Sequence, residues 1–104
     1  MKYGIPENKL VKVVGTISRE SRVEGIVLYG SRAKKTFLLG SDIDLCLEAP
    51  GLDSPTLLRI ENELDDLLLP WKIDIAIRDR IRDPDLLEHI SRVGKTLYLR
   101  KTGS

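Results

Sequence analysis

The 104-residue sequence predicts an α+β domain in which a small mixed β-sheet carries helices on one face. Residues 41–49 and 71–79 alternate apolar and polar side chains with the period of two that is typical of strands. Other segments repeat apolar residues at helical spacing. About ten residues separate the first two apolar runs, too few for a crossover helix, and this predicts an antiparallel pair of strands.

The first half of the chain is expected to form a helix and two strands. The helix follows Pro6, which suits a first helical turn, and apolar residues recur at helical spacing up to about Arg19. Residues 23–30 are apolar and β-branched and close at Gly30, which indicates a buried strand followed by a turn. In residues 41–49 the aliphatic side chains point one way and the acidic ones the other.

The second half is expected to add two helices and one or two strands. Ser54 and Pro55 form an N-cap and first-turn pair for a helix that must end before Pro70. Residues 71–79 then alternate as a strand. An Asp-Pro pair starts a third helix that Gly94 ends, and the segment TLYLR predicts a short last strand.

Length and composition predict one domain over residues 1–104, with an N-terminal helical part at 1–22 and a core at 23–99. Hydrophobic residues make up 41% and charged residues 32%, which excludes a disordered tail. No apolar run approaches the roughly 20 residues of a transmembrane helix, and the start lacks the apolar core of a signal peptide. We expect a cytoplasmic protein without membrane association, and the single Cys46 agrees with a reducing compartment.

The net charge of +1 hides an uneven distribution of charge. Arg32, Lys34 and Lys35 stand directly before an acidic stretch at 42–66. A wholly basic face would have suggested nucleic-acid binding, which is therefore not expected. A basic loop beside a pair of carboxylates suits a phosphate-plus-metal ligand better.

Three carboxylates, Asp42, Asp44 and Asp74, occupy strand positions whose neighbours are aliphatic, so they share the uncovered face if the strands are adjacent. Aspartate is depleted from strands, and burial of its charge is costly unless a cation meets it. Residues two apart on a strand lie roughly 6.6–7 Å from each other, which suits one or two Mg²⁺ ions. Two such ions can hold the attacking and leaving oxygens of a phosphoryl displacement. The alternative is an exposed edge strand whose outward residues are acidic.

The turn before these acids predicts an anion site. Gly30 allows a positive φ or a close backbone approach, and neighbouring amides can form an anion-binding concavity. The Ser31 hydroxyl adds a donor. Arg32 is the expected bidentate partner of a terminal phosphate, with Lys34 or Lys35 as a diffuse positive charge.

The segment GSRAKKTFLLGSDIDLCL resembles the signature of the DNA polymerase β-like nucleotidyltransferase superfamily, in which Gly-Ser is followed after about ten residues by Asp-x-Asp. KIDIAI resembles the strand that carries its third carboxylate. LPWKIDIAI and LLEHISRVGKTLY are similar to the minimal nucleotidyltransferases, the partners and antitoxins of HEPN-domain toxins. The resemblance covers roughly residues 23–99.

The resemblance implies Mg²⁺-dependent transfer of a nucleoside monophosphate, most often AMP from ATP, to a hydroxyl group. In this branch the hydroxyl belongs to a tyrosine of a HEPN-type ribonuclease toxin, which implies an antitoxin in a hetero-oligomer. The roles carried over are Gly30 and Ser31 for the triphosphate, Arg32 for a phosphate, Asp42 and Asp44 for the metals, and Asp74 for the catalytic metal and the acceptor hydroxyl. Lys34 is expected to assist nucleotide binding through its charge alone.

Two other functions remain open at this point. One is a non-catalytic subunit that neutralises or organises a partner by binding alone, through the open sheet face or the apolar Leu38 and Leu39. The other is transfer to a small molecule. Among the remaining reactive side chains, we expect Cys46 to be a packed core residue and His89 to be a surface residue on the polar side of the last helix.

Overall fold

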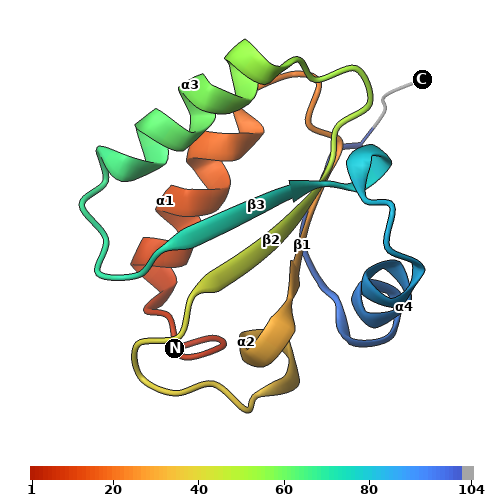
Figure 1. Cartoon of the computed structure of the whole chain (residues 1–104). Coiled ribbons are helices and arrows are strands. Elements are labelled where there is room, and N and C mark those ends of the chain that lie inside the picture. Colours follow the sequence, from red (N-terminus) through yellow and green to blue (C-terminus); the bar gives the residue numbers. More distant parts are fainter. Residues whose placement is uncertain (102–104) are drawn as a thin grey trace.

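The computed structural model describes residues 1–101, so the last three residues of the expected domain lie outside the described part. No helix within residues 1–101 is long and apolar enough to cross a membrane. In chain order the elements are α1 (Glu7–Ser18), β1 (Gly25–Tyr29), α2 (Gly30–Lys34), β2 (Ile43–Glu48), α3 (Ser54–Asp65), β3 (Ile73–Ile77), the 3₁₀ helix η1 (Arg78–Arg80), α4 (Pro84–Val93) and β4 (Lys95–Leu99) (Figure 1).

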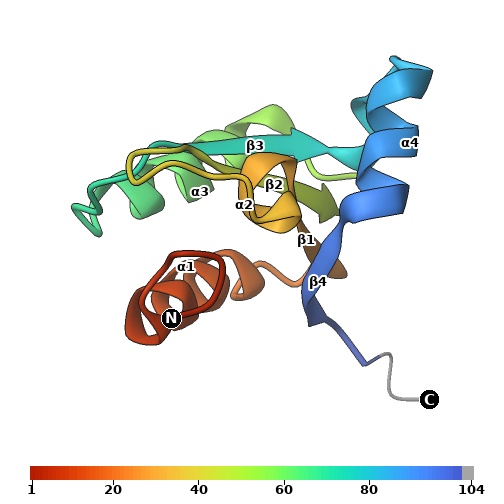
Figure 2. The same ribbon diagram turned by 90° about the horizontal axis from the view of Figure 1, so that it is seen from below.

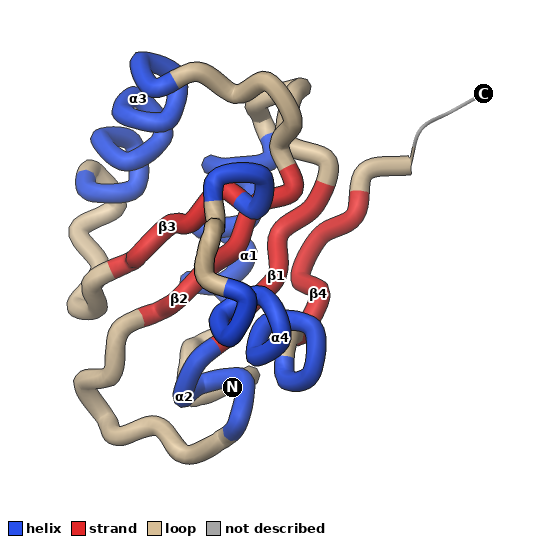
Figure 3. Tube along the Cα trace, turned by 45° about the vertical axis from the view of Figure 1, so that its right-hand side comes forward, coloured by secondary structure: helices blue, strands red, loops and turns tan. Residues whose placement is uncertain are grey.

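The four strands form one mixed sheet in the order β3-β2-β1-β4. β1 pairs antiparallel with both β2 and β4, which confirms the antiparallel pair expected from the short connection. β2 and β3 are parallel, and α3 provides the crossover between them. β4 lies beside β1 at one edge of the sheet (Figure 3), and β3 forms the other edge.

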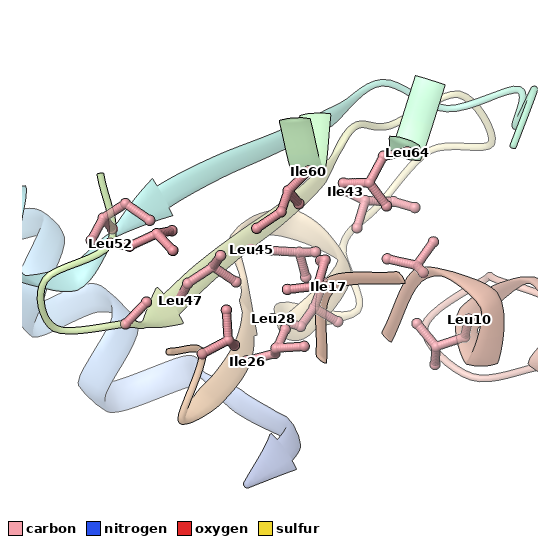
Figure 4. Close-up of a cluster of buried hydrophobic side chains, with 14 of the residues drawn as sticks. Leu10, Ile17, Ile26, Leu28, Ile43, Leu45, Leu47, Leu52, Ile60 and Leu64 are labelled. Atoms are coloured by element: carbon pink, nitrogen blue, oxygen red, sulfur yellow. The ribbon is translucent and has the colours of Figure 1, made fainter. Parts of the chain in front are cut away.

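One face of the sheet is buried under α1 and α3. Ile43, Leu45 and Leu47 of β2 are fully buried there, together with Ile17 of α1 and Ile60 of α3 (Figure 4). These positions are the aliphatic half of the alternating strand pattern and the apolar stripes of the two helices. The predicted α+β class with a mixed sheet is confirmed, and α1 and α3 cover its aliphatic face as expected. The expectation that the helices lie on one face only is wrong for α4, which packs on the opposite face against β1.

The helix α4 lies on the other side of the sheet, near β1 and α2 (Figure 2). Its Ile90 is buried, and Gly94 at its end lies close to the Val27 side chain of β1. Val27 points away from the α1 and α3 face because its neighbours Ile26 and Leu28 point into it. The face that carries the aspartates is therefore covered by α4 at β1 and left open toward β3.

Two local details differ from the expectations. Asp53, rather than Ser54, caps α3, because its side chain accepts a hydrogen bond from the Thr56 amide at 2.8 Å. Gly30 begins the five-residue helix α2 where a simple turn was expected, and Lys35 follows this helix with a left-handed φ of 63°.

Candidate active site

The strand register brings one end of three strands together. Tyr29 at the end of β1 is paired with Asp44 near the start of β2, and Asp44 is paired with Asp74 near the start of β3. This happens because β1 runs antiparallel to β2 whereas β3 runs parallel to it, so the last residues of β1 meet the first residues of the other two. The Gly-Ser turn and two carboxylates therefore lie at the same end of the sheet.

Gly30 lies directly against one of these carboxylates, that of Asp44. Its φ is +75°, a left-handed conformation that side chains disfavour. A Cβ atom at this position would also collide with Oδ2 of Asp44. Both the backbone conformation and the available space therefore require glycine, which explains the residue that the sequence places after β1.

Asp44 is a half-buried carboxylate among other negative groups. Burial raises its pKa, and the nearby charges of Asp74 and Asp42 raise it further. Burial, followed by the charges of Asp44, Cys46 and Asp74, raises the pKa of the Tyr29 hydroxyl. A cation placed among these oxygens would relieve both the desolvation and the repulsion, so the donor set fits a hard divalent ion.

The other two predicted metal ligands are more open. Asp42 precedes β2 and is exposed, and the Asp74 side chain is 45% exposed with the Lys72 ammonium 3.6 Å from its Oδ1. Among residues 1–101, no group of three His, Cys, Asp or Glu side chains is arranged to hold a metal ion. The structure thus pairs Asp44 with Asp74 and keeps Asp42 at the rim.

The other predicted ligand-binding residues all lie on α2 but differ in their exposure to solvent. Ser31 is half-buried in the first turn of α2, and Lys34 is exposed at its end. These two positions are compatible with contact to a ligand above the Gly-Ser turn. Arg32 is not, because only 1% of it is exposed.

The guanidinium of Arg32 is used inside the protein. Its Nε and Nη2 donate to the Ser41 carbonyl at 3.1 and 2.7 Å, and its Nη1 donates to the Tyr3 carbonyl at 2.9 Å. The same group lies over the rings of Phe37 and Trp71, at 5.2 and 5.6 Å from their centroids. The expectation that Arg32 binds a terminal phosphate is at odds with this burial. The contacts indicate that Arg32 ties the N-terminal hairpin, in which Lys2 and Ile5 pair, to the loop before Asp42.

His89 is close to the site, although we expected a surface residue. Its Nε2 accepts a hydrogen bond from the Gly30 amide at 3.2 Å, and its ring meets the Tyr29 ring edge-on at a centroid distance of 6.2 Å. A helical pattern assigns His89 to the polar side of α4 and says nothing of what that side faces. The only sequence signal for the position of His89 is that it is a polar residue beside the apolar stripe of a helix that ends near the sheet.

Cys46 is fully buried on the aspartate face, two residues beyond Asp44. Burial, with a smaller contribution from Glu48, raises the pKa of its thiol to about 11, and Arg78 opposes the shift only in part. A thiol with this pKa stays protonated at neutral pH and is a poor nucleophile. The interpretation of Cys46 as a packing residue agrees with this environment.

The structure brings the Gly-Ser turn and a pair of carboxylates to one end of a mixed sheet, as the resemblance to nucleotidyltransferases implies. The family "Polymerase beta, Nucleotidyltransferase" matches residues 11–103 of this chain. The chain therefore belongs to the polymerase β nucleotidyltransferase family, whose members use nucleotides.

Individual relatives agree with this assignment. A putative protein adenylyltransferase of Methanocaldococcus jannaschii is 43% identical over 61 residues, which are 59% of this chain and 44% of the relative. The chain thus spans less than half of the length of this curated relative.

Solved structures share the fold. A toxin–antitoxin structure with AMP-PNP superposes with a TM-score of 0.70 at 23% identity, over 93% of this chain and 76% of the other. A complex of tri-AMPylated HEPN toxin with MNT antitoxin from Shewanella oneidensis gives 0.67 at 18% identity, over 91% and 73%. A putative nucleotidyltransferase from Sulfolobus solfataricus gives 0.53 at 20% identity, over 91% and 82%.

Proposed function

We propose that this chain is a Mg²⁺-dependent nucleotidyltransferase that moves AMP from ATP to a hydroxyl group of a partner protein. The observation that carries the proposal is the close approach of the positive-φ turn at Gly30 to Asp44, which is paired with Asp74 on the neighbouring strand. Gly30 and Ser31 bind the triphosphate, and Asp42, Asp44 and Asp74 hold the metal ions.

The electrostatics of the carboxylates support the use of a metal. Burial and two negative neighbours raise the pKa of Asp44, so its charged form is destabilised until a cation is present. Bound Mg²⁺, with two ions expected, supplies the positive charge that stabilises the phosphoryl group during transfer. The exposed Lys34 at the end of α2 adds positive charge for the phosphates.

The chemistry is a displacement at the α-phosphorus of ATP. The acceptor oxygen forms a bond to this phosphorus while the bond to the oxygen bridging to the β-phosphate breaks, and pyrophosphate leaves with the electron pair. Asp74 accepts the proton of the acceptor hydroxyl. Its position on the edge strand β3, with nearly half of its side chain exposed, lets an acceptor approach from outside and lets the proton pass to water.

The proposed acceptor is a tyrosine of a helical HEPN-domain toxin, so that the chain acts as its antitoxin in a hetero-oligomer. The Shewanella oneidensis complex of AMPylated HEPN toxin and MNT antitoxin, and the relative named as a protein adenylyltransferase, support this choice. Leu38 and Leu39 are 79% and 93% exposed on the loop that leads to Asp42. They offer an apolar contact for the partner beside the site.

The test is AMP transfer from ATP labelled at the α-phosphate, with Mg²⁺, in the presence and absence of a HEPN-domain protein from the same genome. The variant Asp42→Asn/Asp44→Asn removes two proposed metal ligands. Asp65→Asn/Asp66→Asn is the matched control, because it removes the same charge from exposed positions at the end of α3. We expect label on the partner with the wild type and the control, and none with the first variant.

Two results would contradict the proposal. Full transfer by Asp42→Asn/Asp44→Asn would show that the metal assignment is wrong. A tight complex with the HEPN-domain protein but no label on either protein, with wild type and Mg²⁺ present, would identify a non-catalytic binding subunit instead.

A further inference from the structure

The imidazole of His89 holds the backbone of the Gly-Ser turn. The Gly30 amide donates to Nε2 of His89 at 3.2 Å, although the two residues are 59 positions apart in the chain. An imidazole nitrogen accepts a hydrogen bond only through a lone pair, so this contact requires the tautomer that carries its proton on Nδ1. The contact therefore specifies both the position and the tautomer of His89.

The helix that carries His89 is itself well fixed. Ile90, the next residue, is buried, and Gly94 at the end of α4 lies against Val27 of β1. Edge-on contact with the Tyr29 ring orients the imidazole from the side. His89 therefore anchors the Gly30 amide to a helix that is fixed on the body of the protein, and not to a mobile surface side chain.

The held amide is at the most constrained point of the site. It belongs to the peptide that joins Tyr29 to Gly30, and the Cα of Gly30 lies against the carboxylate of Asp44. Rotation of this peptide would change the φ of Gly30 and move Ser31 relative to Asp44. The hydrogen bond to His89 opposes that rotation.

We propose that His89 is a positioning residue for the nucleoside triphosphate: Nε2 of its imidazole holds the Gly30 amide and thereby keeps Ser31, the next residue, in place beside the contact of Gly30 with Asp44. This inference rests on the proposed function, because it assigns the triphosphate to the Gly-Ser turn. It adds a residue from α4 to a site that the sequence motif places between β1 and β2.

The contact is tested first without any variant. A long-range ¹H–¹⁵N spectrum of uniformly labelled wild-type protein at pH 8 reports which imidazole nitrogen carries the proton. We expect protonated Nδ1 and unprotonated Nε2 for His89, the only histidine of the chain. A proton on Nε2 would overturn the inference, because that nitrogen could then not accept from Gly30.

The role is tested with His89→Leu, which fills a similar space without an acceptor, and with His89→Gln, whose amide oxygen can accept the same bond. Glu88→Gln is the control, because Glu88 is exposed on the same helix and pairs with Arg92 on the surface. The probe is the Mg²⁺ complex of α,β-methylene-ATP, which binds like ATP but has no α,β bridging oxygen to cleave. Its affinity is compared with the KM for ATP and the kcat of transfer.

We expect His89→Leu to weaken analogue binding and raise the KM for ATP roughly 3- to 10-fold, the value of one lost hydrogen bond, with kcat nearly unchanged. His89→Gln should restore most of the affinity, and Glu88→Gln should match the wild type. Wild-type affinity in His89→Leu, or no rescue by His89→Gln in a folded protein, would overturn the inference. Failure of the wild type to bind the analogue would instead overturn the proposed function, whatever the tautomer of His89.

Discussion

At the scale of single residues, the site depends on an unusual backbone conformation and on a side chain that donates hydrogen bonds to backbone carbonyls. Gly30 combines a left-handed φ with direct contact to Asp44, and no other residue type satisfies both. Arg32 occupies a buried position where three of its hydrogen bonds go to carbonyl oxygens. Neighbouring residues of one motif thus have separate tasks: Gly30 is the proposed point of approach to the ligand, and Arg32 supports the loop before Asp42.

Replacement of Gly30 by alanine should destabilise the protein and abolish nucleotide binding. Strain at a positive φ and the collision with Asp44 together should lower the free energy of unfolding by about 2 kcal/mol or more, measured by urea denaturation. Gly51→Ala is the matched control, since Gly51 has a φ of +76° and open space around its Cα. An equal loss in the two variants would show that contact with Asp44 adds nothing.

Replacement of Arg32 by methionine should remove the support of the loop before Asp42. The carbonyls of Ser41 and Tyr3 would lose their donors, so we expect unfolding free energy to fall by about 3 kcal/mol in urea denaturation. Arg82→Met, at an exposed position, should have little effect. If Arg32→Met instead kept full stability and lost only ATP affinity, the phosphate-binding role expected from the motif would be right after all.

At the scale of elements, short capping and packing contacts fix where each helix lies. Asp53 caps α3 and Asp83 caps α4 in the same manner, with a proline at the start of each helix. The α4 helix then carries Ile90 into the interior and His89 toward α2. The position of the proposed site therefore depends on where α4 begins and ends.

The cap of α3 gives a prediction at this scale. Asp53→Ala should lower the melting temperature by about 4 °C, because the Thr56 amide loses its acceptor, and Ser54→Ala should leave it nearly unchanged. The hydrogen bond from Thr56 lowers the pKa of Asp53, so this contribution is present at neutral pH and is lost as the pH falls through the carboxylate pKa in the folded state. A larger loss of melting temperature in Ser54→Ala than in Asp53→Ala would show that Ser54 is the cap of α3, as expected from the sequence.

At the scale of the whole molecule, the chain keeps a destabilising carboxylate in its sheet. The raised pKa of Asp44 means that the folded protein holds its proton more tightly than the unfolded chain does. Protonated Asp44 therefore stabilises the folded state fully below the ordinary pKa of aspartate. This stabilisation is lost as the pH rises through the higher pKa that Asp44 has in the folded state. At neutral pH, charged Asp44 opposes folding unless a cation compensates it.

Metal binding should reverse this effect. Asp44→Asn should raise the melting temperature at pH 7.5 in the absence of divalent ions, because it removes the desolvated charge and its repulsion with Asp74 and Asp42. Adding Mg²⁺ with α,β-methylene-ATP should stabilise the wild type and not the variant. A lower melting temperature for Asp44→Asn in metal-free buffer would contradict the electrostatic argument.

Much of the arrangement follows from the sequence because its signals are local. The alternation in β2 and β3, the apolar stripes of α1 and α3 and the short connection between β1 and β2 predict the α+β sheet and its covered face. The Gly-Ser and Asp-x-Asp spacing likewise predicts that the turn and the carboxylates meet, and the register places Asp44 beside Tyr29 and Asp74. The spacing of apolar residues and the residue types of a turn depend only on neighbours in the chain, so both can be recognised in the sequence.

Only the tertiary structure decided the partners of Arg32 and His89. An arginine after Gly-Ser can point to a ligand or to the interior, and the choice depends on carbonyls of Tyr3 and Ser41 that packing of the N-terminal hairpin and the loop brings near. The meeting of His89 with Gly30 likewise depends on α4 crossing to the second face of the sheet. Such contacts join residues far apart in the chain, so they are set by the packing of whole elements, whereas sequence periodicity specifies only which side of an element a residue occupies.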